Sequence, residues 1–482
     1  MMARQPSTLR ATNADIAHSP PFSLTPHPAQ LHQGAGPPCL QPLTFPAIKL
    51  AHEAAQLTTA PTTDSRRAMY RALLLPVYLP SFLMSVCQGA ALLLIPLYAL
   101  DLGGSPAVAA IIFAFRGLGN MLADVPAGLA AEKFGDARVM QAGVALMILA
   151  AAGCAFASNL LQLGLFSLII GLSMAAWLLA RLTLISDLVA VNFRGQALST
   201  MAGLQRFGNF LGPLSTGYIV YEFGYTTAFM LIAALASTTF CLLMTRAMSA
   251  ETEAALSEPA PISASSPQPH DKPKNAAAHP IWQLLRAHRS ILLTGGAVVF
   301  LLTLIRAART LLLPLWGISL GLNAAEIGTI VGLAAGLDML MFPVAGLLMD
   351  QLGRRPAGMS CLGLLSIGLL LLSCTTTPLT FTLAACVAGL GNGLGSGINM
   401  TLGTDFAPVQ QRGHFLGVWR LIGDAGAFAG PTLISAITAG VGLSMSILCA
   451  SAFGFLGLLI MGRFVPETLK KDTPSGATKD PN

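Results

Sequence analysis

The chain has 482 residues, of which 54% are hydrophobic and only 10% are charged, and its formal net charge is +6. About a quarter of the residues in a soluble domain are charged, so this composition excludes an ordinary soluble protein. The apolar residues form runs of about 18 to 25, long enough to cross ~30 Å of hydrocarbon as helices. The sequence therefore predicts an all-α polytopic membrane protein.

The basic residues and the cysteines do not point to other partners. Lys and Arg beside membrane spans are expected from the positive-inside rule, so the positive charge does not indicate nucleic acid. The eight cysteines are scattered singly, without a Cys-x-x-Cys pair or a Cys/His cluster. They are typical of small core residues, and we expect neither a metal nor a cofactor.

The chain begins with a polar segment. Residues 1–68 are rich in Pro, His, Gln, Thr and Ala, without apolar periodicity and without the basic and apolar regions of a secretory signal. We expect a disordered tail. An alternative is that translation starts at Met69, because the basic residues around it lead directly into the first span.

Twelve apolar segments follow, each long enough to be a membrane span. They are expected at residues 73–100, 106–130, 139–157, 160–183, 197–220, 226–245, 290–318, 325–349, 357–374, 378–402, 414–438 and 442–463. Lys and Arg gather in the connections after the even-numbered spans and in the C-terminal tail. Both termini are therefore expected in the cytoplasm, and the expected location is the inner membrane of a bacterium.

One long internal connection divides the spans into six and six. Residues 247–280 are rich in Ser, Pro, Ala and Glu and are typical of a flexible linker, and residues 281–288 resemble an amphipathic helix on the inner membrane surface. The expected domains are a tail (1–68), a first bundle (69–246), the linker with its short helix (247–288), a second bundle (289–465) and a C-terminal disordered tail (466–482).

A charged loop between the second and third spans occurs again in the second half. Its first copy has Gly128, Glu132 and Gly135, and its second has Gly346, Asp350 and Gly353, so that each residue lies 218 positions from its counterpart. At the same offset, Asp187 falls on Asp405, and Gly212-Pro213 falls on Gly430-Pro431. Charged pairs and Gly-Pro pairs in one register are not expected by chance. The sequence therefore predicts twelve transmembrane helices in two pseudo-symmetric six-helix bundles.

These features resemble the major facilitator superfamily of secondary transporters. Its loop signature, Gly-x-x-x-Asp-x-x-Gly followed by two basic residues, matches residues 346–355, which end in Arg354 and Arg355. The first copy departs from the signature, because Glu132 replaces the Asp and Asp136 stands where a basic residue is expected. The resemblance implies two bundles that carry a small solute by alternating access, and we expect a monomer in the lipid bilayer.

The resemblance also implies roles for two motifs. The loop acids Glu132 and Asp350 are expected to face a helix N-terminus of the other bundle and to latch the inner side, the second copy more strongly; the alternative is that they merely lie on solvated loops. Span five contains Gly208, Gly212 and Pro213, similar to the Gly-x-x-x-Gly-Pro motif of proton-coupled antiporters. This motif and its second copy either take part in coupling or are simple helix bends.

Charged and polar side chains inside spans are costly and are functional candidates. A group toward the inner ends of the spans is interpreted mainly as a structural and gating network: Arg181, Asp187, Arg206, Asp405, Arg420 and Asp424. A deeper group is expected to line a central cavity: Gln88, Arg116, Asn120, Arg306, Arg309 and Asp338. The deeper arginines favour an anionic or strongly polar solute. The alternative is that each arginine is paired with Asp338 or with helix carbonyls.

Proton coupling requires a carboxyl group that can be buried, and Asp338 is the first candidate and Asp124 the second. A proton is preferred to sodium because no cluster of acids suits a metal ion. We expect proton-coupled efflux of a small organic solute by antiport. The alternatives are proton-coupled uptake of an organic anion and a receptor or assembly factor without transport activity. An enzyme is not expected, because the chain has no His-Glu-x-x-His, Gly-x-Ser-x-Gly or Gly-x-x-x-x-Gly-Lys-Ser/Thr motif.

Overall fold

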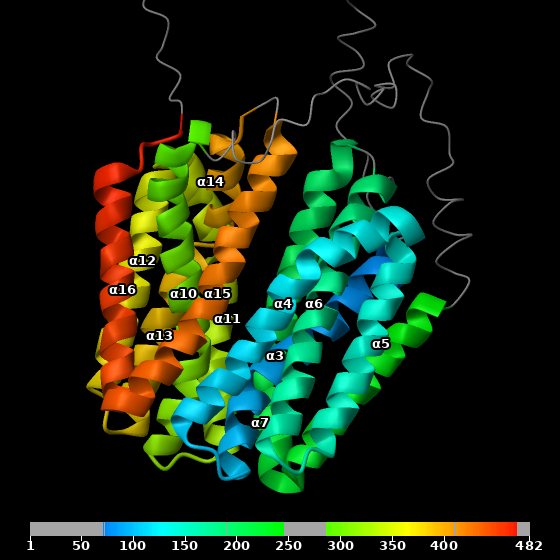
Figure 1. Cartoon of the computed structure of the whole chain (residues 1–482), viewed down its shortest axis with the longest axis vertical. Helices are drawn as coiled ribbons and strands as arrows, with labels where there is room; N and C mark the ends of the chain where they lie inside the picture. Colours follow the sequence, from blue (N-terminus) through cyan, green and yellow to red (C-terminus); the bar gives the residue numbers. More distant parts are fainter. Residues whose placement is uncertain (1–70, 72, 190, 245–285, 409–410, 470–482) are drawn as a thin grey trace, which may run out of the picture. The chain divides into compact units, whose positions relative to one another are not determined.

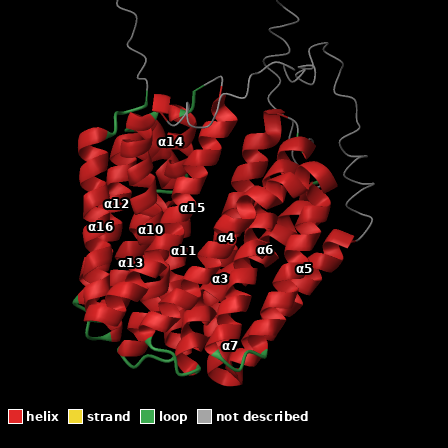
Figure 2. Cartoon of the chain, in the orientation of Figure 1, coloured by secondary structure: helices red, strands yellow, loops and turns green. Residues whose placement is uncertain are grey.

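The structure is a computed structural model, and it describes residues 71, 73–189, 191–244, 286–408 and 411–469. Every regular element in these ranges is a helix, and Figure 2 shows the helices joined by loops. The predicted tail 1–68, the linker 247–280 and most of the predicted amphipathic helix 281–288 lie outside the described residues. The C-terminal tail is described as far as residue 469.

The helices follow the predicted spans closely. The first half contains the π-helix η1 (Leu74–Tyr78), α3 (Leu79–Asp101), α4 (Pro106–Phe134), α5 (Asp136–Ala155), α6 (Leu160–Leu188) and α7 (Val191–Met244). The second half contains α10 (Arg289–Ser319), α11 (Ala324–Gln351), α12 (Arg354–Ser373), α13 (Pro378–Leu394), α14 (Ile398–Phe406), α15 (Arg412–Val441) and α16 (Leu443–Phe464).

The number of membrane spans depends on a turn inside α7. Eleven segments of the described chain are long and apolar enough to cross a membrane, and the longest is Phe193–Met244. At Gly224 the backbone of α7 has φ 80° and ψ 172°, so this segment contains two passes. Eleven segments with one double pass give the twelve predicted spans. The predicted fold class is confirmed.

Glycines with positive φ mark corresponding turns in the two halves: Gly103 with Gly321, Gly135 with Gly353, and Gly224 with Gly442. The members of each pair lie 218 positions apart. A side chain would strain the backbone at such a position, which accounts for the second glycine of the charged loop. The last pair shows that the repeat extends as far as the sixth span of each half.

The helices of the two halves form separate groups. Figure 1 shows those of the first half, coloured blue to green, apart from those of the second half, coloured yellow-green to red. In each group the fifth span packs tightly on the first. A Cβ added to Gly212 would lie 2.6 Å from the Ala90 nitrogen in α3, and one added to Gly430 would lie 2.5 Å from the Leu304 oxygen in α10. These glycines therefore permit close helix packing, and α7 departs from helical backbone angles at Gly224 rather than at Pro213.

Two seams join the halves, one between α7 and α11 and the other between α4 and α15. On the first seam, a Cβ added to Gly328 would lie 2.6 Å from the Pro213 oxygen, and one added to Gly217 would lie 2.8 Å from the Gly328 Cα. On the second, the Ser435 hydroxyl donates to the Ala107 oxygen at 2.7 Å. Both contacts lie near the turns that follow odd-numbered spans. The halves are therefore packed together at the end opposite the ends of the described chain.

Candidate functional site

A cavity of about 180 Å³ lies between the two halves. Its polar lining consists of Asn209 from α7, Arg309 and Thr310 from α10, Asp338 from α11 and Asn392 from α13. Most of the remaining lining is apolar. An apolar cavity with a few convergent polar groups is the usual form of a small-molecule site, although typical pockets measure about 300–1,000 Å³. This cavity is the candidate site, and its size suits a small solute.

Side chains from both halves hold Asp338. Arg206 of α7 donates to Oδ1 at 2.6 Å, and Asn392 donates from Nδ2 to Oδ2 at 2.5 Å. The Arg206 guanidinium also lies 4.8 Å from the centre of the Phe342 ring. The Arg206 and Asp338 side chains are 24% and 17% exposed. Both carboxyl oxygens of Asp338 therefore have donors, and one of these donors belongs to the other half of the protein.

Arg309 lines the same cavity but makes no hydrogen bond to any described residue. Its residue is 8% exposed, and its Nε is buried without a partner. The carboxyl group of Asp338 is already bound by Arg206 and Asn392. Because an unpaired buried cation is costly, the cavity is suited to a solute that brings a negative group to Arg309.

Arg306 has a different environment, although it lies only three residues before Arg309. Its Nη2 donates to the backbone oxygens of Gly395, at 2.9 Å, and Asn392, at 3.4 Å. These oxygens lie where the tenth span is interrupted between α13 and α14. Irregular backbone at membrane depth requires such partners. Arg306 therefore matches the alternative in which an arginine bonds to helix carbonyls.

The other predicted cavity residues do not line this site. Gln88 and Asn120 line a separate cavity of about 40 Å³ inside the first half, together with Arg181 and Gln205. Arg116 is one helical turn before Asn120, and its guanidinium lies 5.3 Å from the centre of the Phe113 ring. Of the six residues in the deeper group, two therefore line the central cavity, two line the smaller cavity, and Arg116 and Arg306 line neither.

The predicted inner network is also divided. Arg420 of α15 reaches Asp124 of α4 at 2.6 Å, across the second seam, and Asp424 at 3.6 Å on its own helix. Arg354 pairs with Asp405 at 3.2 Å within the second half. Arg206 instead binds Asp338, which lines the central cavity, and Arg181 lines the smaller cavity. The side chain of Asp187 lies outside the described ones.

The loop acids Glu132 and Asp350 are exposed and make no hydrogen bond or ion pair with any described residue. A Cβ added to Gly346 would meet nothing within 4 Å, and one added to Gly128 would lie 3.6 Å from Leu179. The structure is packed together at the opposite end of the bundles. The latch therefore stays a prediction for the conformation in which the loop end is closed.

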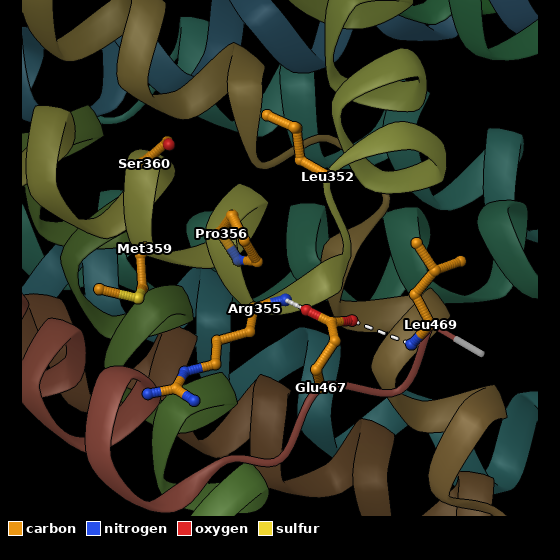
Figure 3. A pocket seen from close by; sticks show the side chains of 7 residues that line it. All are labelled: Leu352, Arg355, Pro356, Met359, Ser360, Glu467 and Leu469. Atoms are coloured by element: carbon orange, nitrogen blue, oxygen red, sulfur yellow. Dashed lines mark hydrogen bonds between the residues drawn. The ribbon is translucent and has the colours of Figure 1, made fainter. Parts of the chain in front are cut away.

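Glu467, which follows the last span, caps the helix that begins in the second loop. Its carboxylate accepts from the backbone nitrogens of Arg354 at 2.8 Å and Arg355 at 2.9 Å. Figure 3 shows the bond from Arg355. The helix N-cap is Gly353, which has no side chain to serve this purpose. Burial alone would raise the pKa of Glu467, but the backbone N–H groups of Leu469, Arg354, Arg355 and Thr468 outweigh it and hold the pKa below its usual value.

This cap predicts a pH-dependent contribution to stability. Because the pKa of Glu467 is lower in the folded protein, its contribution should be complete above the usual value of 4.5 and lost as the pH falls through the folded-state pKa. Glu467→Gln should lower the free energy of unfolding by about 1 kcal/mol at neutral pH, the usual value of a cap in an exposed position. Thermal unfolding at neutral and acidic pH measures this difference, which should shrink in acid. Glu222→Gln, at an exposed residue, is the control; equal effects of both variants would contradict the cap.

Asn209 and Asn392 contribute polar groups to the cavity and were not predicted from the sequence. Their counterparts at the offset of 218 are Ala427 and Met174, so comparison of the halves did not mark them. The available signal was the polar side chain itself, isolated within an apolar span.

A family model described as Major Facilitator Superfamily matches residues 77–337 and 296–481. The cis,cis-muconate transport protein of Acinetobacter baylyi is 22% identical over 404 residues, which cover 81% of this chain and 94% of that protein. The niacin transporter of the same organism is 29% identical over 127 residues, or 26% of this chain and 29% of that protein. The multidrug resistance protein MdtG of Proteus mirabilis is 24% identical over 34% of this chain and 42% of that protein. The chain thus matches less than half the length of the latter two relatives.

Solved structures share the fold. The inward-open xylose transporter XylE from E. coli has a TM-score of 0.57 at 15% identity, and covers 84% of this chain and 96% of its own. A peptide transporter, POT, has a TM-score of 0.63 at 15% identity, and covers 81% of this chain and 94% of its own. The family match spans both halves and the site between them. The chain therefore belongs to the Major Facilitator Superfamily.

Proposed function

We propose that this protein is a proton-coupled transporter that carries a small organic anion by alternating access to the cavity between its halves. The proposal rests on the different hydrogen-bond partners of Asp338 and Arg309 in that cavity. Asp338 has donors on both carboxyl oxygens, whereas Arg309 has no hydrogen-bond partner among the described residues. The cavity therefore presents a guanidinium group without a hydrogen-bond partner among the described residues, which a carboxylate would satisfy by charge-assisted hydrogen bonds.

Among the relatives, the match that spans both chains also supports an anion. Its name identifies a transport protein for cis,cis-muconate, which is a dicarboxylate. The match to a multidrug resistance protein covers only 34% of this chain, so it is the weaker guide to the solute. Muconate is therefore a rational first probe, and other organic anions of similar size should follow it.

The coupling role assigned to Asp338 rests on its position between the halves. A proton on Asp338 would replace its ion pair with Arg206 by a weaker hydrogen bond from the charged guanidinium to a neutral carboxyl group. Because Arg206 belongs to the first half, protonation would weaken a bond that crosses a seam and would shift the population of conformations. Asp124, which pairs with Arg420 across the other seam at 2.6 Å, is the second candidate.

The direction of transport is a separate part of the proposal. The antiporter-like glycines of α7 pack on α3, and their counterparts in α15 pack in the same way on α10, so a packing role accounts for both copies. Uptake of an anion with protons is therefore proposed ahead of efflux by antiport. The sign of the imposed pH gradient that drives accumulation distinguishes the two directions.

Proteoliposomes with an imposed pH gradient test the proposal directly. Muconate, nicotinate and lipophilic cations would be offered separately, and both solute uptake and internal pH would be recorded. We expect accumulation of an organic anion together with proton movement. Transport of the cations without any of the anions would overturn the anion assignment, and anion flux indifferent to the gradient would overturn the coupling.

Variants of the two neighbouring arginines separate binding from structure. Arg309→Ala should weaken binding of the transported anion by about tenfold to a hundredfold, the value of a lost charge-assisted hydrogen bond, with little loss of stability. Arg306→Ala should mainly destabilise the protein, because it removes a charged donor from the Gly395 and Asn392 oxygens. Titration calorimetry and thermal unfolding measure the two effects, with the exposed Arg289→Ala as the control. Unchanged affinity in Arg309→Ala would remove this residue from the site.

A further inference from the structure

The small cavity inside the first half contains a buried arginine without an acidic partner. Arg181 of α6 is 2% exposed, and its Nε is buried without a hydrogen-bond partner. Its Nη2 donates to the Gln205 side chain at 3.3 Å, and its guanidinium lies 5.9 Å from the centre of the Trp177 ring. The ion pairs found among the described side chains do not include Arg181.

The repeat explains what is missing from this cavity. At the offset of 218, Gln88 corresponds to Arg306 and Asn120 corresponds to Asp338. The second half thus places an arginine and an acid at positions where the first half has two neutral amides. The first half nevertheless has Arg181 beside these amides, whose N–H groups can donate to an anion. The positive charge is present in both halves, whereas the carboxylate is present only in the second.

A second arginine adds to the imbalance. Arg116 lies four residues before Asn120 on α4, about 6 Å along the helix axis. Its Nε is also buried without a partner, and none of the ion pairs between described residues involves it. A second buried guanidinium, that of Arg116 beside the Phe113 ring, therefore lies on the same helix as Asn120 and forms no ion pair with a described carboxylate.

An unpaired charge at this depth is expensive, because the surrounding helices and lipid do not solvate it as water does. A bound anion would remove that cost. The cavity of about 40 Å³ is comparable with the ~30 Å³ that one water occupies in the liquid. It therefore has room for a chloride ion or a single carboxylate group, but not for a large anion.

We propose that the first half contains an anion subsite, in which Arg181, Gln205, Gln88 and Asn120 bind a chloride ion or the carboxylate end of a solute. The bound anion takes the place that the Asp338 carboxyl group fills in the second half. Gln205 lies one helical turn from Asn209, which lines the central cavity, so the two sites border neighbouring turns of α7. The case in which the anion is the carboxylate of a transported solute rests on the proposed function, whereas the case of a bound chloride ion does not.

Thermal unfolding of the purified protein tests the subsite without any transport. Sodium chloride and sodium formate, compared with sodium gluconate at equal ionic strength, should raise the unfolding temperature of the wild type, because gluconate is too large for the cavity. Arg181→Gln should lose this response, with an apparent affinity at least about tenfold weaker. The exposed Arg138→Gln should keep it. An equal response in Arg181→Gln, or no difference between chloride, formate and gluconate in the wild type, would overturn the subsite.

A second variant supplies the missing carboxylate. Asn120→Asp should raise the unfolding temperature in gluconate to that of the wild type in chloride, and should no longer respond to chloride. Asn159→Asp, at an exposed helix cap, is the matched control and should behave like the wild type. A chloride response in Asn120→Asp equal to that of the wild type would contradict the idea that the anion substitutes for an acid.

Muconate distinguishes the two sources of the anion and separates this inference from the proposed function. If the solute brings its carboxylate to Arg181, calorimetry should detect muconate binding, and chloride should compete with muconate. If the site takes an inorganic anion, chloride should stabilise the protein without competing. Absence of muconate and nicotinate binding, together with an intact chloride response, would count against the proposed function and leave the subsite standing.

Discussion

Replacing Asp338 by Asn is expected to abolish solute accumulation driven by a pH gradient, while solute exchange at equal pH on both sides continues. The variant keeps a side chain of the same shape, whose oxygen can accept from Arg206 and whose NH2 group can donate to Asn392 once the Asn392 amide turns its oxygen toward it. It cannot gain or lose a proton. Loss of the charge also leaves Arg206 unpaired, at a cost of about 2–3 kcal/mol, near the lower end for a broken buried ion pair because the pair is partly exposed.

Gradient-driven uptake and solute exchange at equal pH are measured in the same proteoliposomes. The first requires proton coupling, whereas the second requires only the conformational change of the protein with solute bound. Asp405→Asn is a suitable control, because it breaks an ion pair with Arg354 in the same half but outside the cavity. It should lower stability and preserve gradient-driven uptake. Gradient-driven uptake by Asp338→Asn at the wild-type rate would transfer the coupling role to Asp124.

The fold could be predicted from composition and from the repeat because both signals are distributed along the chain. Twelve apolar runs set the number of helices, and the offset of 218 related the halves before any contact was known. The sequence also allowed the prediction that Asp338 and Arg309 line a central cavity. Both lie far from the ends of their spans, where a charge is costly unless it has a function.

Contacts between helices could not be predicted from composition or from the repeat. Arg206 was placed in the inner network because the predicted span began at residue 197, whereas α7 begins at Val191. Fifteen residues from that start correspond to about 22 Å, which puts Arg206 near the membrane centre, where it meets Asp338. The sequence left two environments open for Arg306, a cavity lining and a bond to helix carbonyls, because the interruption at residues 395–397 is a tertiary feature. The counterpart of Gly395 in the first half is Trp177, within the unbroken helix α6.

The two seams carry different charges at corresponding positions. Arg206 and Asp424 are repeat counterparts, and so are Asn120 and Asp338. On the first seam the fifth span supplies the cation and the partner span supplies the acid; on the second, α15 has both Arg420 and Asp424 beside Asp124. The duplicated unit therefore has one backbone plan but two sets of polar bonds, which allows the halves to differ in solute and proton binding.

Gly328→Val is expected to stop transport by preventing the two halves from packing together at the end opposite the described termini. A Cβ at this position would lie 2.6 Å from the Pro213 oxygen and 2.8 Å from the Gly217 Cα, and backbone atoms cannot move away as a flexible side chain can. Overpacking of this kind costs about 1–3 kcal/mol. A cost of about 3 kcal/mol would change the ratio of closed to open conformations by about a hundredfold.

The substitution should open the protein rather than unfold it, because the contact joins two bundles that are each packed internally. A cysteine introduced by Leu92→Cys in the cavity, in a protein without its native cysteines, would report the change. In the Gly328→Val background it should react faster with a membrane-impermeant reagent added on the side that the closed end faces. Gly440→Val, at a site with nothing within 4 Å of the added Cβ, should leave both labelling and transport unchanged. Wild-type transport by Gly328→Val would show that tight packing of α7 on α11 is not required in the transport cycle. The two halves would then have to close through the seam between α4 and α15 alone.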